Sequence, residues 1–166
     1  MNKTTEHEAI VSMTKAGVTA ALYVVLTFAV APFSYGAFQF RISEMFNHLI
    51  DFNKRYIWAL TIGCFITNIT SPLGPIDMIV GTLGTLSSGL IIYFITKHIP
   101  NLIGKLVVST IVPTVVGMLP IAIELHIVQH VPFWLTYGTS MIGEFGSCLV
   151  GAFITYALAK RIDLTK

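Results

Sequence analysis

Apolar segments long enough to cross a lipid bilayer make up most of this chain. Of its 166 residues, 54% are hydrophobic and only 11% are charged, and the mean hydropathy is +0.77. Soluble domains carry about 25% charged residues, so this composition excludes an ordinary water-soluble protein. Because no internal repeat or low-complexity tract is present, residues 1–166 are predicted to form a single all-α domain embedded in the membrane.

Prolines and clusters of turn-forming residues divide the chain into six segments. We expect helices over residues 13–33, 40–52, 54–69, 76–96, 103–125 and 134–161. The second segment is too short to cross a bilayer by itself, and the third is near the lower limit of length. Pro113 and Pro120 interrupt the fifth segment. The sequence therefore predicts a six-helix bundle with uneven helices.

The basic residues are distributed unevenly over these six segments. If the N-terminus is cytoplasmic and the segments alternate in direction, nine of the ten Lys and Arg residues fall on the cytoplasmic side. These nine are Lys3, Lys15, Lys54, Arg55, Lys97, Lys105, Lys160, Arg161 and Lys166. Such a bias follows the positive-inside rule. We therefore predict a multi-pass protein of the cell membrane with both termini in the cytoplasm.

The second segment opens with polar residues that are costly inside a membrane. Arg41, Glu44 and Asn47 are spaced three residues apart, so they share one helix face, and Phe40 lies one turn before Glu44. Ionisable groups at membrane depth are rare and usually functional. This face offers the groups that a buried polar ligand needs. The alternative is an amphipathic helix at the membrane interface that carries an internal salt bridge.

Four acidic residues fall in the outer half of the bundle or near its middle: Glu44, Asp77, Glu124 and Glu144. Against the single Arg41, they give a local charge of about −3 if all are ionised, which would attract a cationic solute into an outward-facing cavity. Glu144 is the deepest, about 15 Å along the last segment from its start. For Glu144 the alternative to a binding role is a structural carboxyl bonded to a neighbouring helix.

Other polar residues fit binding and structural roles about equally. Asp77 in the first turn of its helix complements the helix dipole without any ligand. Asn68 lies in the preceding irregular stretch, which must be buried in protein or line a cavity. Trp134 and Tyr137 suit either an interfacial aromatic belt or a stacking wall. Glu124, near the end of the fifth segment, is expected to be solvated beside an outer loop.

Ala16 and Ala20 are four residues apart on the first segment, a spacing of small residues that lets helices pack closely. Their partner is either another membrane subunit or this same chain. The sequence contains no phosphate-binding loop that ends in Gly-Lys-Ser/Thr, no credible catalytic triad and no metal-spaced pair of histidines. We therefore predict no enzymatic activity, no cofactor, no metal site and no nucleic-acid partner.

Four stretches of the chain carry a resemblance to a known family. They are Gln39–Glu44, Ile62–Asn68, Ser71–Gly74 and Asp77–Leu86. In these stretches the chain resembles the QueT family of predicted queuosine-precursor transporters, which are S-components, the substrate-binding membrane subunits of energy-coupling-factor (ECF) importers. The resemblance implies the six-helix S-component fold. It also implies a 7-deazaguanine base, such as 7-aminomethyl-7-deazaguanine, as the substrate.

The implied substrate suggests roles for residues that the sequence pattern already singles out, and for Glu144 the role rests on its depth in the last segment and not on a family motif. The expected substrate-binding residues are Phe40, Arg41, Glu44, Asn47, Asn68, Asp77, Trp134, Tyr137 and Glu144. Among them Glu44 and Glu144 would supply two carboxylates, and Arg41 would either orient Glu44 or bind the ring carbonyl. Ala16 and Ala20 match the Ala-x-x-x-Ala motif with which such subunits meet the ECF module, a scaffold membrane subunit and two ATPases.

A different class of protein also fits the deep glutamate. Glu144 could carry protons in a self-sufficient secondary transporter or antiporter of small cationic solutes. The lack of a visible internal repeat tells against this alternative.

Overall fold

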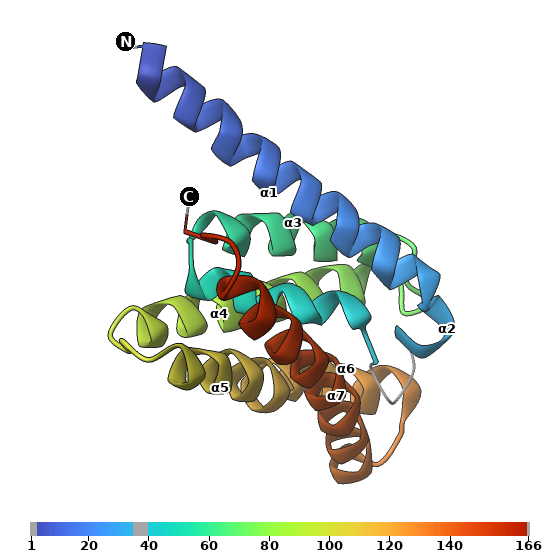
Figure 1. Ribbon diagram of the computed structural model, residues 1–166. Coiled ribbons are helices and arrows are strands. Elements are labelled where there is room, and N and C mark those ends of the chain that lie inside the picture. The colour runs from blue at the N-terminus through green and yellow to red at the C-terminus, as the bar shows by residue number, and fades with distance from the viewer. Residues whose placement is uncertain (1–2, 35–39, 166) are drawn as a thin grey trace.

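A computed structural model describes residues 3–34 and 40–165, and the described residues form helices with no strands. Figure 1 shows these helices gathered into one bundle, with the N-terminal part of the first helix extending beyond it. In chain order the elements are α1 (Lys3–Ala29), α2 (Ala31–Ser34), η1 (Ile42–Asp51), α3 (Arg55–Asn68), α4 (Pro75–Thr96), α5 (Leu102–Val112), η2 (Pro113–Gly117), α6 (Met118–Gln129) and α7 (Phe133–Ala159). Gln39, which opens the first stretch of the family resemblance, lies outside the described residues.

Many large apolar side chains lie on the outer surface of the bundle, and many polar side chains are buried inside it beside an apolar core. Trp58 and Phe153 are 60% and 70% exposed, whereas Asn68, His48 and Glu144 are fully buried. Water would not stabilise this arrangement, because it hydrates polar groups and excludes apolar ones. Lipid chains would cover the outer surface at no such cost. The distribution of side chains therefore agrees with a protein that is surrounded by the hydrocarbon of a membrane.

Four helical stretches are long and apolar enough to cross a membrane, counted over the described residues. They are Glu6–Ala29, Pro75–Thr96, Leu102–Gln129 and Phe133–Ala159. The α3 helix has 14 residues and extends about 21 Å at 1.5 Å per residue, which is less than the roughly 30 Å hydrocarbon core. η1 is shorter still. The structure thus supports a multi-pass membrane protein with four helical stretches long enough to span the membrane and two shorter elements, α3 and η1.

The second segment is a 3-10 helix and not the α-helix that its sequence suggested. η1 has 10 residues, whereas most 3-10 helices end after three or four. With three residues per turn, side chains at i and i+3 lie directly above one another. Glu44 and Asn47 therefore form one row, and His48 and Asp51 form the neighbouring row. η1 packs against α1, α3, α4, α5 and α7. The row of Glu44 and Asn47 faces the space between α4 and α7, and the row of His48 and Asp51 faces α5.

The fifth segment is one continuous helical stretch with a defect in its middle. Pro113 begins a π-helical turn, η2, which connects α5 to α6. A proline cannot donate the backbone hydrogen bond of a regular helix, and wide turns of this kind are frequent at functional sites. The stretch continues as α6 to Gln129. The outer loop expected after Leu125 is therefore mostly helix. The helix ends at Gln129, and the next residue, His130, adopts a left-handed backbone conformation.

Arg55 and Lys105 lie at one end of the bundle, where the last described residues also pack. The backbone carbonyl of Thr165 accepts hydrogen bonds from Asn53 and Arg55, at the junction of η1 and α3. Lys105 donates to the carbonyl of Asp51 at the same end. We call this the basic end. The opposite end contains Asn68, the start of α4 and the end of α6.

Candidate functional site

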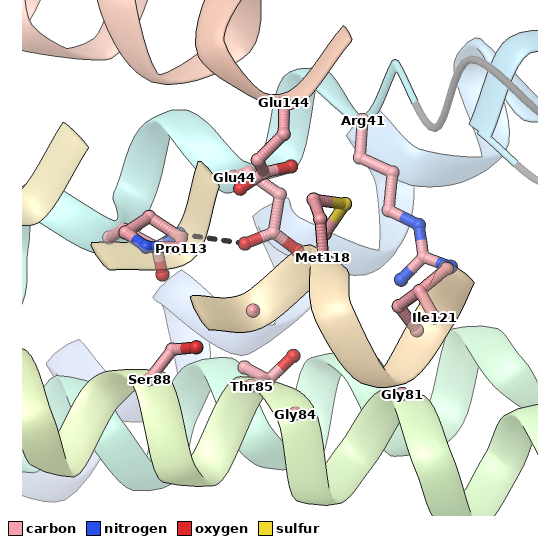
Figure 2. A pocket seen from close by; sticks show the side chains of 12 residues that line it. Arg41, Glu44, Gly81, Gly84, Thr85, Ser88, Pro113, Met118, Ile121 and Glu144 are labelled. Carbon is pink, nitrogen blue, oxygen red and sulfur yellow. Dashed lines mark hydrogen bonds between the residues drawn. The ribbon is translucent and has the colours of Figure 1, made fainter. Parts of the chain in front are cut away.

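A small buried cavity lies between η1, α4, η2, α6 and α7. It encloses about 20 Å³, roughly enough for one water molecule, whereas sites for small ligands measure about 300–1,000 Å³. Four of the nine sequence candidates line it: Arg41, Glu44, Asn47 and Glu144. Figure 2 shows Glu44 and Glu144 approaching the same space from η1 and α7. A flat bicyclic ligand would require these helices to move apart.

Glu44 is held in place by two hydrogen-bond donors. The hydroxyl of Tyr23 on α1 donates to its Oε1, and Nδ2 of Asn47 donates to its Oε2 at 2.8 Å. Tyr23 is itself fully buried, and its ring lies against Gly63 of α3, where an added Cβ would meet it at 3.0 Å. Each carboxylate oxygen has a second lone pair. Glu44 is therefore a fixed acceptor that can still bind a donor from a ligand.

Glu144 has fewer protein partners than Glu44. The thiol of Cys148, one turn along α7, lies 3.5 Å from its Oε1, which is a weak hydrogen bond. Its Oε2 is buried and has no hydrogen-bond partner in the described part of the chain. A buried carboxylate oxygen without a donor is costly. Such an oxygen suits a ligand that brings its own N–H or ammonium group.

The wall opposite these acids is built from small residues. Gly81, Gly84 and Thr85 of α4 line the cavity together with Gly117 of η2. A Cβ at Gly81 would stand 2.3 Å from Nδ2 of Asn68, so a larger residue at this position would displace the Asn68 side chain. Small side chains leave a flat surface of backbone and methyl groups. A planar ring could lie against such a surface.

Arg41 lies at the rim of the cavity between η1 and α4. Its Nε donates to the carbonyl of Ser34 at 3.1 Å, and its Nη2 forms an ion pair with Oδ1 of Asp77 at 4.0 Å. Asn68 donates to the backbone carbonyl of Asp77 at 3.1 Å. Asn68 and Asp77 therefore do not line the cavity but hold the residues at its rim.

The aromatic candidates lie elsewhere. Trp134 is 79% exposed at the start of α7, and Tyr137 donates its hydroxyl to the carbonyl of Val115 while its ring stacks on Phe133. Phe40 lies near Gly146 of α7, away from the cavity lining. None of the three aromatic candidates lines this cavity, whose lining on the α4 side consists of Gly81, Gly84, Thr85 and Ser88.

Glu124 contradicts its sequence interpretation. It was expected to be solvated at a helix end, yet it is only 3% exposed. The cause is that α6 continues to Gln129 and packs against both α4 and α7. Glu124 therefore lies within the packed part of α6 and not in a solvated loop at the end of the helix.

Several residues at the cavity were not singled out by sequence reasoning. Tyr23 follows Thr19 and precedes Thr27 at intervals of four, a buried polar row that α1 presents to the bundle. On α4, Gly81, Thr85 and Ser88 recur at helical spacing and all line the cavity. Both rows are periodic in the sequence and could have been found as polar or small stripes. Over the described residues, no group of His, Cys, Asp or Glu side chains is arranged to hold a metal ion.

Comparison with known proteins agrees with this arrangement of a polar centre inside membrane helices. A profile of the family described as "QueT transporter" matches residues 13–160. A protein of Lactococcus lactis subsp. cremoris (strain MG1363), named "Queuosine precursor transporter QueT", is 43% identical over 157 residues, which cover 90% of this chain and 92% of the relative. No solved structure matches. The chain is therefore a multi-pass membrane protein that belongs to the QueT transporter family.

Proposed function

We propose that this chain is the substrate-binding S-component of an ECF importer, and that it captures a 7-deazaguanine base such as 7-aminomethyl-7-deazaguanine. The observation that carries the proposal is the meeting of Glu44 and Glu144, from η1 and α7, in one buried cavity. The guanine-like edge of the base has two adjacent N–H donors, which one carboxylate can accept together. Glu44 and Glu144 bind the ring, and Arg41 donates to the ring carbonyl.

The geometry favours different roles for the two acids. Glu44 is oriented by Tyr23 and Asn47, so it provides a preorganised acceptor. Oε2 of Glu144 has no donor among the described residues, so it gains most when a ligand arrives. The basic end of the bundle faces the cytoplasm in this proposal, as the positive-inside rule requires. The end with Asp77 and Glu124 then faces the outside.

Binding titrations with the purified full-length chain test the proposal. Glu44→Gln and Glu144→Gln keep the side-chain shape and remove the charge, and each should weaken binding of the base by about 30-fold or more, as for buried charged contacts in general. Glu6→Gln, in the exposed part of α1, is the matched control and should bind normally. Unchanged affinity in both cavity variants would eliminate this scheme.

Transport in this proposal is driven by separate ATPase subunits that associate through a scaffold membrane protein. The N-terminal part of α1 extends away from the bundle (Figure 1). Farther along the same helix, Ala16 and Ala20 are half-buried, while Gly17 is open to the surroundings. Ala16→Leu combined with Ala20→Leu should reduce co-purification of the partners and leave base binding unchanged. Val25→Leu, at an exposed site on the same helix, should affect neither.

A proton-coupled secondary transporter is the second candidate, and the observation that favours it is the buried, sparsely bonded Glu144. Reconstitution of the isolated chain in liposomes separates the two. Uptake of the base driven by a pH gradient alone supports the secondary transporter. Binding without uptake supports the S-component.

A further inference from the structure

Glu124 is a buried acid that the cavity itself does not use. The side chain of Glu124 is only 3% exposed. Neither of its carboxylate oxygens has a hydrogen-bond partner within residues 3–34 and 40–165. Burial of a carboxylate without a donor or a cation is strongly unfavourable. A side chain with no structural partner is therefore a candidate for contact with a ligand.

Glu124 and Asp77 flank the outer rim of the cavity on two different helices. Ile121, three residues before Glu124 on α6, lines the cavity, and so does Gly81, four residues after Asp77 on α4. Residues three or four apart lie on the same helix face, about 4.5–6 Å apart along the axis. Oδ1 of Asp77 stands 3.3 Å from the position of a Cβ at Gly81. The two acids thus lie one turn beyond the cavity, on the faces that form it.

The charges at this rim do not balance. Glu124 lies within electrostatic range of both Asp77 and Arg41, and Arg41 is ion-paired with Asp77 at 4.0 Å. Arg41 also interacts electrostatically with Glu44 and Glu144 of the cavity, so the carboxylates around it outnumber the single guanidinium. An additional positive charge beside Glu124 and Asp77 would reduce this imbalance, and a primary ammonium can donate to more than one acid because it has three N–H bonds.

We propose that Glu124 and Asp77 form an outer subsite that binds the primary ammonium group on the 7-substituent of the ligand. This inference rests on the proposed function. In a 7-deazaguanine base the ring carbonyl and the 7-substituent are neighbours on one edge. A ring whose carbonyl meets Arg41 therefore places its 7-substituent near Asp77 and Glu124, the acids that interact with Arg41. The subsite selects an aminomethyl base over the neutral 7-cyano base.

Calorimetric titration of the full-length chain in lipid nanodiscs with both bases tests the subsite. The wild-type chain should bind 7-aminomethyl-7-deazaguanine at least tenfold more tightly than 7-cyano-7-deazaguanine, in keeping with a hydrogen-bonded charge, worth about a factor of ten or more. Glu124→Gln should weaken binding of the aminomethyl base by about tenfold and that of the cyano base less than twofold. Glu8→Gln, exposed on α1, is the control and should change neither.

Three results would overturn the subsite while leaving the proposed function intact. They are equal wild-type affinity for the two bases, equal weakening of both by Glu124→Gln, and no weakening of either. If the wild-type chain binds neither base, the proposed function itself fails, and the subsite with it. The comparison of the two bases on the wild-type chain needs no variant. It therefore tests the subsite even if Glu124→Gln does not fold. Glu124→Asp keeps the charge and should retain most of the preference.

Discussion

The two buried rows of η1 carry similar polar residues but have very different surroundings. Along one row, Glu44 and Asn47 face a cavity that they share with Glu144, whose Oε2 has no hydrogen-bond partner in the described structure. Along the other, His48 contacts Thr110 at 3.1 Å and Asp51 accepts from Ser109 at 2.8 Å. The second row is joined to α5 by direct side-chain hydrogen bonds. The first row is bonded to α1 through Tyr23 and Glu44, and it also lines the cavity between the helices.

This difference separates polar groups that hold the bundle together from polar groups that are available to a ligand. Burial alone does not distinguish them, since Asp51 and Glu144 are both buried. Each also has one carboxylate oxygen without a hydrogen-bond partner among the described residues, Oδ1 of Asp51 and Oε2 of Glu144. What distinguishes them is the partner of the other oxygen: the hydroxyl of Ser109 donates to Oδ2 of Asp51 at 2.8 Å, whereas Glu144 has only the thiol of Cys148. Removing Asp51 should therefore affect stability, and removing Glu144 should affect binding.

The largest expected effect comes from the contact that positions both rows. A Cβ at Gly151 would stand 2.5 Å from the backbone of Met45, so Gly151→Ala forces α7 away from η1. We expect the free energy of unfolding to fall by about 3 kcal/mol, with loss of base binding as well. Gly138→Ala, on the same helix with open space around it, should instead gain up to about 1 kcal/mol. Denaturant unfolding in detergent measures the stability of both variants. If Gly151→Ala is as stable as the wild-type chain, the tight contact between η1 and α7 is refuted.

An intermediate effect is expected at the basic end of η1. Asp51→Ala removes the acceptor of Ser109 and should lower the free energy of unfolding by about 2 kcal/mol, as for hydrogen bonds to charged groups. Affinity for the base should stay within about twofold, because Asp51 lies on the row that faces α5. Ser109→Ala should show a similar loss, and the double variant should lose less than the sum. If Asp51→Ala weakens binding as strongly as Glu144→Gln, the division between the two rows is wrong.

The smallest effect is expected at Trp134, which the sequence placed in the binding site and the structure places on the surface. Because the side chain is 79% exposed, Trp134→Ala should change the free energy of unfolding by less than about 0.5 kcal/mol and leave base binding unaltered. The same titrations measure this. A marked loss of affinity would mean that the start of α7 closes over the ligand when it binds.

Sequence reasoning found the acids of the cavity because charge inside an apolar segment is visible without a structure. Arg41, Glu44 and Glu144 were singled out on that ground alone. It failed for Glu124, because the burial of that residue depends on how far α6 extends and on its packing against α4 and α7. It also passed over Tyr23, since a tyrosine in a membrane helix is as often at the lipid interface as inside the bundle.

The sequence by itself determined that this is a helical membrane protein of the QueT transporter type and where most of its helices lie. Those properties follow from the hydropathy and length of each apolar segment and from the Pro and Gly residues that end it, all of which can be read along the chain. Only the tertiary structure decided which acids share a space and which are bonded to the protein. That outcome depends on the 3-10 winding of η1 and on the rotation of α4, α6 and α7 about their axes. A rotation of one residue would move a side chain by about 100°, and local sequence preferences do not fix it.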